Sequence, residues 1–412
     1  MKTKSSHLTP ITVIFICLIL DFLGLGLILP VLNNIFKDPS ADLFRHETTQ
    51  QYRNAMYLIS YSLFFLATFF GAPVIGALCD KYGRRKLIIF TASSTAVSTT
   101  IVLAGICFNA LLLVFLGRLI AGLFSGMLIV LQSSIADISH PSQKAKNFGI
   151  IGIAFGIGFS IGPILGSLLS DSKINDSFGY YLPYTLATII NIINVVFIFF
   201  FFKETLSSNK QIQINYFKGL TNVQNAFKNI TLRTIFVIIF ILATGFSLYL
   251  QNFQSLLIDI YQLNKLQIGI ALLYVGLWIA LAQGFILRIL LKYLKPWQIL
   301  KFSIPMMGIS FILLLLTKST LSFFCVVPLL CISQGCTFPN TLSIISNNTA
   351  DDTQGEALSI NQSVQSLASS MPLLLAYLAA HYQSFTLLFG AACAFIAYII
   401  YIYNLNVYKS NN

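Results

Sequence analysis

The stretch GALCDKYGRRKL, residues Gly76–Leu87, lies between two long apolar runs of the chain. Each run is about 20 residues long, which is the length at which a helix crosses a bilayer. Basic residues crowd the second half of the stretch, at Lys81, Arg84, Arg85 and Lys86. We therefore expect a short turn that joins two membrane-spanning helices on one side of the membrane.

The composition of the whole chain agrees with that expectation. Hydrophobic residues make up 56% of the 412 residues and charged residues only 9%, whereas a soluble protein of this length needs far more polar surface. Similar apolar runs recur along the sequence. The expected spans cover residues 11–32, 55–79, 86–108, 111–137, 148–170, 182–202, 232–258, 267–291, 298–317, 320–346, 357–380 and 384–406. The fold class is an all-α polytopic membrane protein with twelve transmembrane helices.

The net charge of +12 is explained by the positions of the basic residues. They gather on every second loop, and the positive-inside rule assigns such loops to the cytoplasm. The chain is thus expected in the inner, cytoplasmic membrane with both termini in the cytosol, and without a nucleic-acid partner. The seven cysteines lie within or at the ends of spans and show no metal-ligand spacing, so neither a metal site nor a catalytic centre is expected.

The longest polar interruption is Lys203–Asn229, and it divides six spans from six. We expect an N-terminal six-helix bundle over residues 1–202, a cytoplasmic linker over 203–231 and a C-terminal six-helix bundle over 232–412. Gly76 and Gly284 begin related stretches about half a chain apart, which hints at duplication. Two pseudo-symmetric halves with a substrate site between them are typical of secondary transporters.

Three motifs carry a resemblance to a known family. GALCDKYGRRKL resembles the loop 2–3 motif of the major facilitator superfamily through Gly76, Asp80, Gly83 and Arg84, among others. GRLIAGLFSG, which contains Arg118, is similar to the span-four motif, and GIGFSIGPILGS, residues 156–167, resembles the span-five antiporter motif. DFLGLGLILPVL of span one is similar to span one of tetracycline-type drug/proton antiporters, and so is TQGEALSINQSVQSLASSMPLLLA, the tail of span ten into span eleven. The resemblance implies the major facilitator fold, a central cavity lined by spans one, four, seven and ten, and proton-coupled export.

Asp21 stands within the apolar run ILDFLGLGLILPVL, and every other acid of the chain falls in a loop or at a helix end on this topology. A charge at the bilayer centre costs about 2.5–3.5 kcal/mol on insertion scales, so it should face a partner or water. Removal from water favours the neutral carboxyl and would let Asp21 exchange a proton near neutral pH. We interpret Asp21 as a proton-coupling site; a hydrogen-bonded packing residue is the alternative.

Arg118 lies some eight residues into span four, roughly 12 Å below its outer end. It could provide a counter-charge to the proton site, contact an anionic substrate, or extend to the outer interface. The resemblance favours the first, a proton-coupling role beside Asp21.

Two sets of residues are expected to control conformational change rather than chemistry. Asp80 can accept the N-terminal amides of a helix, or an arginine of the facing bundle, and so hold the cytoplasmic side closed; Gly76, Gly83 and Arg84 belong to the same gate. In span five, small residues and a proline give a smooth helix face that should pack tightly against the other half: Gly152, Gly156, Gly158, Gly162, Pro163 and Gly166.

Uncharged amides in the second half are the candidates for substrate binding: Gln251, Gln254, Gln283 and Gln365. Amide groups among aromatic residues fit a mainly apolar ligand that carries a few polar groups. The chain departs from tetracycline pumps because it has no acid in span three and no histidine in span eight, which argues against tetracycline itself as cargo.

The sequence favours a monomeric proton-driven antiporter that exports a small drug-like or metabolite molecule, without a cofactor and with the proton gradient as energy source. A siderophore or organic-anion transporter, in either direction, is the alternative. A membrane receptor or enzyme is disfavoured, because no catalytic pair lies in the spans. No phosphate-binding loop of the ATPase type occurs.

The topology makes a direct prediction. Cysteines introduced at residues 81, 85 and 86 should react with an impermeant thiol reagent only from the cytoplasmic side, because basic loops stay there. Labelling of these positions from outside the cell would contradict the topology.

Overall fold

The computed structural model describes most of the chain. The described residues are 9–38, 41, 43–44, 47–170, 178–206, 230–263, 265–349, 353–372, 374–375 and 383–404. All of the regular secondary structure in these ranges is helical.

The helices fall into two sequential sets. The first set is α1 (Pro10–Lys37), α2 (Gln50–Tyr82), α3 (Arg84–Cys107), α4 (Leu111–Leu123), α5 (Met127–Asp137), η1 (Pro141–Gln143), α6 (Lys144–Leu169) and α7 (Tyr181–Phe201). The second set is α9 (Ile230–Asp259), α10 (Lys265–Leu281), η2 (Ala282–Ile286), α11 (Leu287–Tyr293), α12 (Pro296–Leu316), α13 (Thr320–Asn347), α14 (Gln354–Ser370) and α16 (Gln383–Tyr403).

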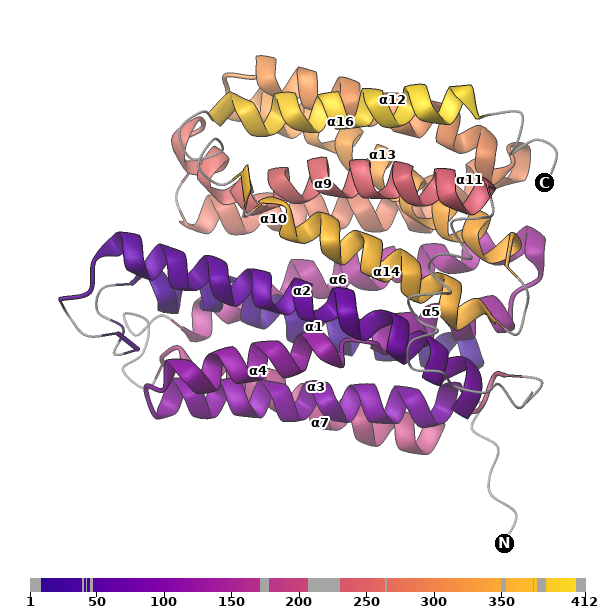
Figure 1. The fold of residues 1–412 in the computed structure, drawn as a ribbon. Coiled ribbons are helices and arrows are strands. Elements are labelled where there is room, and N and C mark those ends of the chain that lie inside the picture. The colour runs from indigo at the N-terminus through magenta and orange to yellow at the C-terminus, as the bar shows by residue number, and fades with distance from the viewer. Residues whose placement is uncertain are drawn as a thin grey trace, which may run out of the picture.

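The two sets lie side by side with their helices roughly parallel to a common axis (Figure 1). Within the first set, α1 packs extensively on α6 and α7; within the second, α12 packs on α13 and α9 on α16. The most extensive contacts between the sets are α14 with α2 and α10 with α6. These two helix pairs form the walls along which the halves meet.

Eleven helices of the described chain are long and apolar enough to cross a membrane. They match eleven of the twelve predicted spans. The twelfth, predicted over 357–380, is described as α14 up to Ser370, and residues 373 and 376–380 of that span lie outside the described residues. The predicted all-helical polytopic fold is confirmed.

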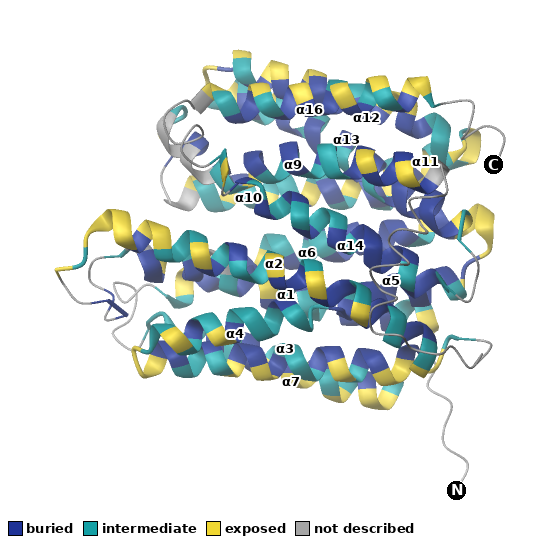
Figure 2. Cartoon of the chain, viewed as in Figure 1, coloured by how far each residue is buried: buried dark blue, intermediate teal, exposed yellow. Residues whose placement is uncertain are grey.

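Exposed residues occur along the outer faces of the helices (Figure 2), and many of them are large and apolar. On α7, for example, Ile192, Ile193 and Phe200 are all more than half exposed. In water such a surface would drive association, whereas in a bilayer the lipid chains cover it. The exposed apolar face is therefore the lipid-facing side of the protein.

The fourth predicted span is divided by a turn. The sequence predicts one helix over 111–137, but α4 ends at Leu123 and α5 begins at Met127. A Cβ atom on Gly126 would stand 2.2 Å from Cγ2 of Ile75 in α2. The break thus lies beside α2, at a glycine that both permits a close approach and weakens the helix.

The eighth predicted span also contains an irregularity. Between α10 and α11, residues Ala282–Ile286 form a π-helical turn. Single π turns inside α-helices occur frequently at functional sites. This one includes Gln283, a predicted substrate-binding residue.

The crossing of α2 and α4 depends on two glycines and gives a stability prediction. A Cβ atom on Gly122 would stand 2.3 Å from the carbonyl oxygen of Phe64, and one on Gly71 would stand 2.0 Å from that of Leu123. Gly122→Ala should destabilise the protein by about 1–3 kcal/mol through overpacking. Thermal unfolding in detergent measures the loss.

Gly269 in α10 provides the control, because a Cβ atom there meets nothing within 4 Å. Gly269→Ala should be neutral or stabilise by up to about 1 kcal/mol. Equal stability of the two variants would contradict the close crossing of α2 and α4.

Candidate functional site

A cavity of about 320 Å³ lies where the two halves meet. Its walls come from α1, α5, α6, α9, α10, η2, α13 and α14. The four spans that the family resemblance implied, one, four, seven and ten, all contribute, and spans five, eight and eleven line it as well. The apolar wall combines aliphatic side chains with aromatic rings, which are Phe22, Phe155, Phe159, Phe246, Tyr249, Phe253 and Phe338.

A few uncharged polar groups interrupt this apolar wall. Gln283, Gln334 and Gln365 line the cavity together with Ser247 and Ser369, whose hydroxyl oxygens lie 3.2 Å apart. Such a site suits a ligand that is mostly apolar and carries a few hydrogen-bonding groups. Gln334 of α13 thus lines the cavity in the same way as Gln283 and Gln365.

The four predicted substrate residues are not brought together. Gln283 and Gln365 line the cavity. Gln251 is not among its lining residues and instead contacts the side chain of Tyr61 on α2, across the halves. The side chain of Gln254 lies outside the described residues.

The side chain of Gln283 packs tightly between the two halves. It is 4% exposed, and its Oε1 has no hydrogen-bond donor among the described residues. A Cβ atom on Gly152 of α6 would stand only 1.9 Å from the Gln283 amide carbon. The amide therefore occupies the space that a larger residue at position 152 would need, and its free oxygen is available to a ligand.

Asp21 and the cavity lie on different faces of α1. The next residue, Phe22, lines the cavity, but Asp21 is not among the lining residues. Asp21 follows Cys17 by one turn and the two side chains interact electrostatically. The carbonyl of Cys17 accepts a hydrogen bond from Asn194 on α7, so this face of α1 is directed toward α7.

Arg118 is not brought to Asp21. Its guanidinium lies 4.5 Å from the ring centroid of Phe64, a cation–π distance, and its Nε makes a long contact of 3.5 Å with the carbonyl of Ser60. Its electrostatic neighbours are tyrosines of α2 and α7. Within the described chain, Arg118 forms no ion pair with a carboxylate.

The carboxylate of Asp80, at the end of α2, makes polar contacts with both halves of the protein. Its Oδ1 lies 2.7 Å from Nη1 of Arg84 and accepts the N–H of Gly355 at 2.9 Å. Its Oδ2 accepts the N–H of Glu356 at 2.8 Å. Gly355 and Glu356 are in the first turn of α14, whose N–H groups have no partner within the helix. We call this set, Asp80 with Arg84 and the first turn of α14, the latch.

Arg84 extends the latch into the first half. Its Nε and Nη2 donate to the two carboxylate oxygens of Asp137, at the end of α5, at 2.9 and 3.2 Å. The guanidinium is fully buried and also donates to the carbonyl of Cys79. A buried arginine is tolerated here because two carboxylates and a carbonyl accept its hydrogen bonds.

Gly83 has two structural requirements. Its φ is +89°, a value that favours glycine, and a Cβ atom there would stand 2.4 Å from Oε2 of Glu204. The Glu204 carboxylate accepts the N–H groups of Arg84 and Arg85, at 2.9 and 3.1 Å, at the start of α3. Gly83 thus permits both the turn and the approach of a capping acid.

A second contact between the halves involves Lys144, the first residue of α6. It is 5% exposed, and its Nζ donates to the carbonyl of Ser346 at 3.3 Å, near the end of α13. A cation at a helix C-terminus is favoured by the helix dipole. In the sequence, Lys144 is one of the basic residues that mark an expected cytoplasmic loop. Its burial and the roles of Asp137 and Glu204 have no sequence signal beyond a charge at a span end.

The glycines of span five divide between two faces of α6. Cβ atoms on Gly158, Gly162 and Gly166 would collide with α1 of the same half, at 2.4–2.7 Å. The expectation that these residues and Pro163 pack against the other half is therefore wrong for the three glycines. Gly152 and Gly156 do face the other half, at Gln283 and Gly276. The helical repeat places residues 158, 162 and 166 on one stripe and 152 and 156 on another.

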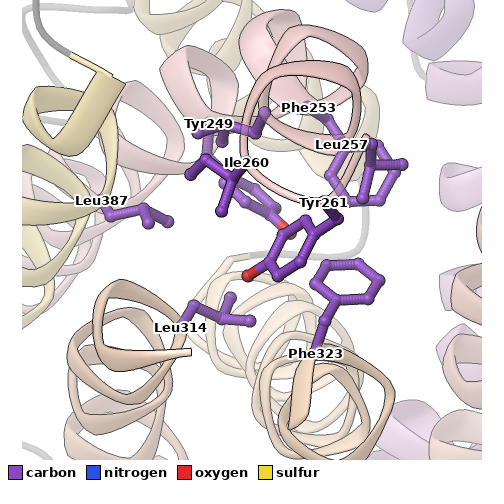
Figure 3. A pocket seen from close by; sticks show the side chains of 9 residues that line it. Tyr249, Phe253, Leu257, Ile260, Tyr261, Leu314, Phe323 and Leu387 are labelled. Carbon is purple, nitrogen blue, oxygen red and sulfur yellow. The ribbon is translucent and has the colours of Figure 1, made fainter. Parts of the chain in front are cut away.

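A much smaller pocket lies within the second half (Figure 3). It has a volume of about 10 Å³ and is lined by residues that include Tyr249, Phe253, Tyr261 and Phe323. That is room for about one water molecule. The large cavity between the halves is therefore the candidate binding site.

The fold and site together define a class of protein: a polytopic helical membrane protein with a ligand-sized cavity between two helix bundles. Its family follows from sequence. A family profile described as Major Facilitator Superfamily matches residues 13–373. The chain belongs to the Major Facilitator Superfamily, and it is therefore a membrane transporter rather than an enzyme.

Relatives of known role are similar over most of their length. The chain is 27% identical to a class G tetracycline resistance protein of Vibrio anguillarum over 356 residues, 85% of each chain. It is 24% identical to a class C tetracycline resistance protein of Escherichia coli over 354 residues, 85% of this chain and 84% of that one. Among solved structures, the human organic anion transporter MFSD10 (TETRAN) has a TM-score of 0.80 at 19% identity, covering 95% and 98% of the two chains. The proton:xylose symporter XylE has a TM-score of 0.76 at 12% identity, covering 95% and 94%. These structures share the fold.

The latch makes a testable prediction about opening. Asp80→Asn removes the charge that strengthens three hydrogen bonds, each worth about 1.5–3 kcal/mol when one partner is ionised. The α2–α14 contact should then open at least about tenfold more often, since 1.4 kcal/mol is a factor of ten. Ser359, fully buried against Gly76, is the reporter position: the alkylation rate of Ser359→Cys should rise when Asp80→Asn is added.

In the Ser359→Cys variants, the exposed cysteines Cys107 and Cys325 are replaced as well, so that they do not react with the alkylating reagent. Lys86→Gln, at an exposed position of the same end, is the matched charge control and should leave the rate unchanged. An Asp80→Asn variant that weakens ligand binding while alkylation stays slow would contradict the latch.

Proposed function

We propose that the protein is a proton-driven antiporter that exports a small, drug-like or metabolite molecule. The observation that carries the proposal is the position of Asp21. It is a carboxylate near the middle of α1, and its neighbour Phe22 lines the cavity between the halves. All other acids of the described chain lie in loops or at helix ends. One helix therefore carries both the titratable group and part of the cargo wall.

The energetics support proton coupling at this position. An ionised carboxylate at membrane depth is costly, and protonation removes that cost. A conformational change that exposes Asp21 to water on one side and then on the other would load and release one proton per cycle. The similarity to tetracycline resistance proteins over most of the chain supports drug efflux over the siderophore or organic-anion alternative.

The cavity supports a mostly apolar cargo. Its wall combines aromatic rings with the amides of Gln283, Gln334 and Gln365. A volume of about 320 Å³ is at the lower end of ligand pockets, which span about 300–1,000 Å³. Arg118 is not among the lining residues, so this cavity offers no fixed cation to an anionic cargo.

Export, in this proposal, begins at the cytoplasmic end of the protein. Basic loops put the latch end in the cytosol together with both termini, in the inner membrane. That end is closed by the latch and by the Lys144–Ser346 contact. Alternating access then requires a second arrangement in which these contacts break and cargo enters from the cytosol. The working unit is a monomer whose partners are cargo, protons and lipid.

The proposal is tested with purified protein in proteoliposomes that carry an imposed pH gradient and a drug panel that includes tetracycline. Asp21→Asn keeps the size and hydrogen-bonding capacity of the side chain but removes titration. Uptake against a concentration gradient and cargo-dependent proton movement should fall to background, while downhill exchange and binding should persist.

Asp21→Glu, which retains an acid, should keep measurable coupling. Glu47→Gln neutralises an exposed acid outside the spans and should behave as the unsubstituted protein. Full proton coupling in Asp21→Asn would remove Asp21 from the mechanism and, since no second carboxylate of the described chain lies at its depth, would contradict proton antiport.

A further inference from the structure

Two buried asparagines on α7 are unusual for a membrane-spanning helix. Asn191 and Asn194 are 5% and 2% exposed. Burying an amide without full hydrogen bonding costs free energy, so their place in an otherwise apolar helix requires a compensating partner.

Both asparagines face α1 on either side of Asp21. Nδ2 of Asn194 donates to the carbonyl of Cys17 at 3.2 Å. Oδ1 of Asn191 lies 3.2 Å from the place that a Cβ atom on Gly24 would take. With 3.6 residues per turn, positions 17, 21 and 24 form one stripe on α1. Asp21 therefore lies between the two points at which the asparagines meet α1.

The polar atoms at this contact are incompletely satisfied. Oδ1 of Asn194 is buried and accepts no hydrogen bond in the described part of the chain. Asn191 has a partner of its own, since its Nδ2 donates to the hydroxyl of Thr99 on α3 at 3.1 Å. Asp21 makes no hydrogen bond with any described side chain. The unsatisfied Oδ1 thus belongs to a side chain that contacts α1 one turn before Asp21.

We propose that Asn194 is a positioning residue for the proton carried by Asp21. The O–H of the neutral carboxyl donates to Oδ1 of Asn194. When the proton leaves to water, the amide rotates and its Nδ2 donates to the carboxylate instead. One amide can serve both protonation states because it carries an acceptor and two donors. Only the O–H bond of the carboxyl forms and breaks, with water as source and recipient of the proton.

Charged groups that could replace Asn194 in this role are distant. Cys17 is the titratable side chain in electrostatic contact with Asp21. Of the helices packed against α1, α5 carries its acid at its last residue, Asp137, and α6 carries its lysines in its first turn. On α2, the charged residues Arg53, Asp80 and Lys81 lie near the two ends of the helix. Tyr57 and Tyr61 of α2 and Tyr184 of α7 interact with Arg118. An uncharged amide is thus the polar partner at this depth.

The placement separates the proton from the cargo. Asp21 faces α7 inside the first half, and Phe22, about 100° around the helix, faces the cavity. A rotation or tilt of α1 would change the surroundings of Asp21 and of Phe22 at the same time. Coupling then passes through α1 as a rigid element and needs no direct contact between proton site and cargo.

Infrared spectroscopy tests the hydrogen bond without any cargo. Acid-minus-alkaline difference spectra of the purified protein contain the carbonyl stretching band of each carboxyl that becomes neutral. The band absent from Asp21→Asn belongs to Asp21. We expect it at the frequency of a hydrogen-bonded acid, and we expect it to shift upward in Asn194→Leu and in Asn194→Ala.

Asn340→Leu is the matched control. Asn340 is also fully buried, donates to a backbone carbonyl of Cys336, and has an Oδ1 without a donor in the described chain. Its loss should leave the Asp21 band in place. An Asp21 band at the non-bonded frequency in the unsubstituted protein would overturn the proposal even if the Asn194 variants failed to fold. An unchanged band in folded Asn194 variants, or an equal shift in Asn340→Leu, would also overturn it.

The inference rests on the proposed function, because the proton on Asp21 is taken to be the transported one. The two can fail separately. The infrared band reports the Asp21–Asn194 contact, whereas proton movement in proteoliposomes reports antiport.

Discussion

The carboxylate of Asp80 at the start of α14 is the interaction on which the closed end of the molecule depends. A carboxylate that is 5% exposed needs each of its lone pairs to be satisfied. The first turn of a helix has N–H groups that need acceptors. The N–H groups of Gly355 and Glu356 donate to the Asp80 carboxylate. Because donors and acceptor belong to different halves, these hydrogen bonds hold the protein closed at this end. The close approach of Gly76 to Gly355 and Ser359 follows from the same contact.

The helix α1 is the second element with a wide influence. One stripe, which includes Gly26, packs directly on the glycines of α6. A second stripe, at Cys17 and Gly24, meets the asparagines of α7, and Phe22 faces the cavity. A helix that is packed on several sides moves as a unit. Any change in the ionisation of Asp21 therefore acts on a helix that also shapes the cargo site.

Much of the site could be anticipated from residue patterns, but its partners could not. The loop 2–3 motif identified Asp80, Gly83 and Arg84, yet Glu204 and Asp137, which complete their network, are distant in sequence and carry no local pattern. The glutamines of the second half were identified as a group, but Gln283 and Gln365 line the cavity and Gln251 does not. The glycines of α6 were recognised as a packing device, but sequence spacing alone did not say which stripe faces which neighbour.

By itself, the sequence determined that this is a polytopic helical membrane protein, because apolar run length and helix periodicity are local properties of the chain. Its motifs carried the resemblance to the Major Facilitator Superfamily. It also isolated Asp21, since elimination along the chain leaves no other deep acid. Only the tertiary structure decided that Asp21 turns toward α7 rather than the cavity, and that Arg118 lies against Phe64. Those outcomes depend on the rotation of each helix about its axis. That rotation is set by side chains of other helices, such as Asn194 and Gly162, which are far away in the sequence and adjacent in space.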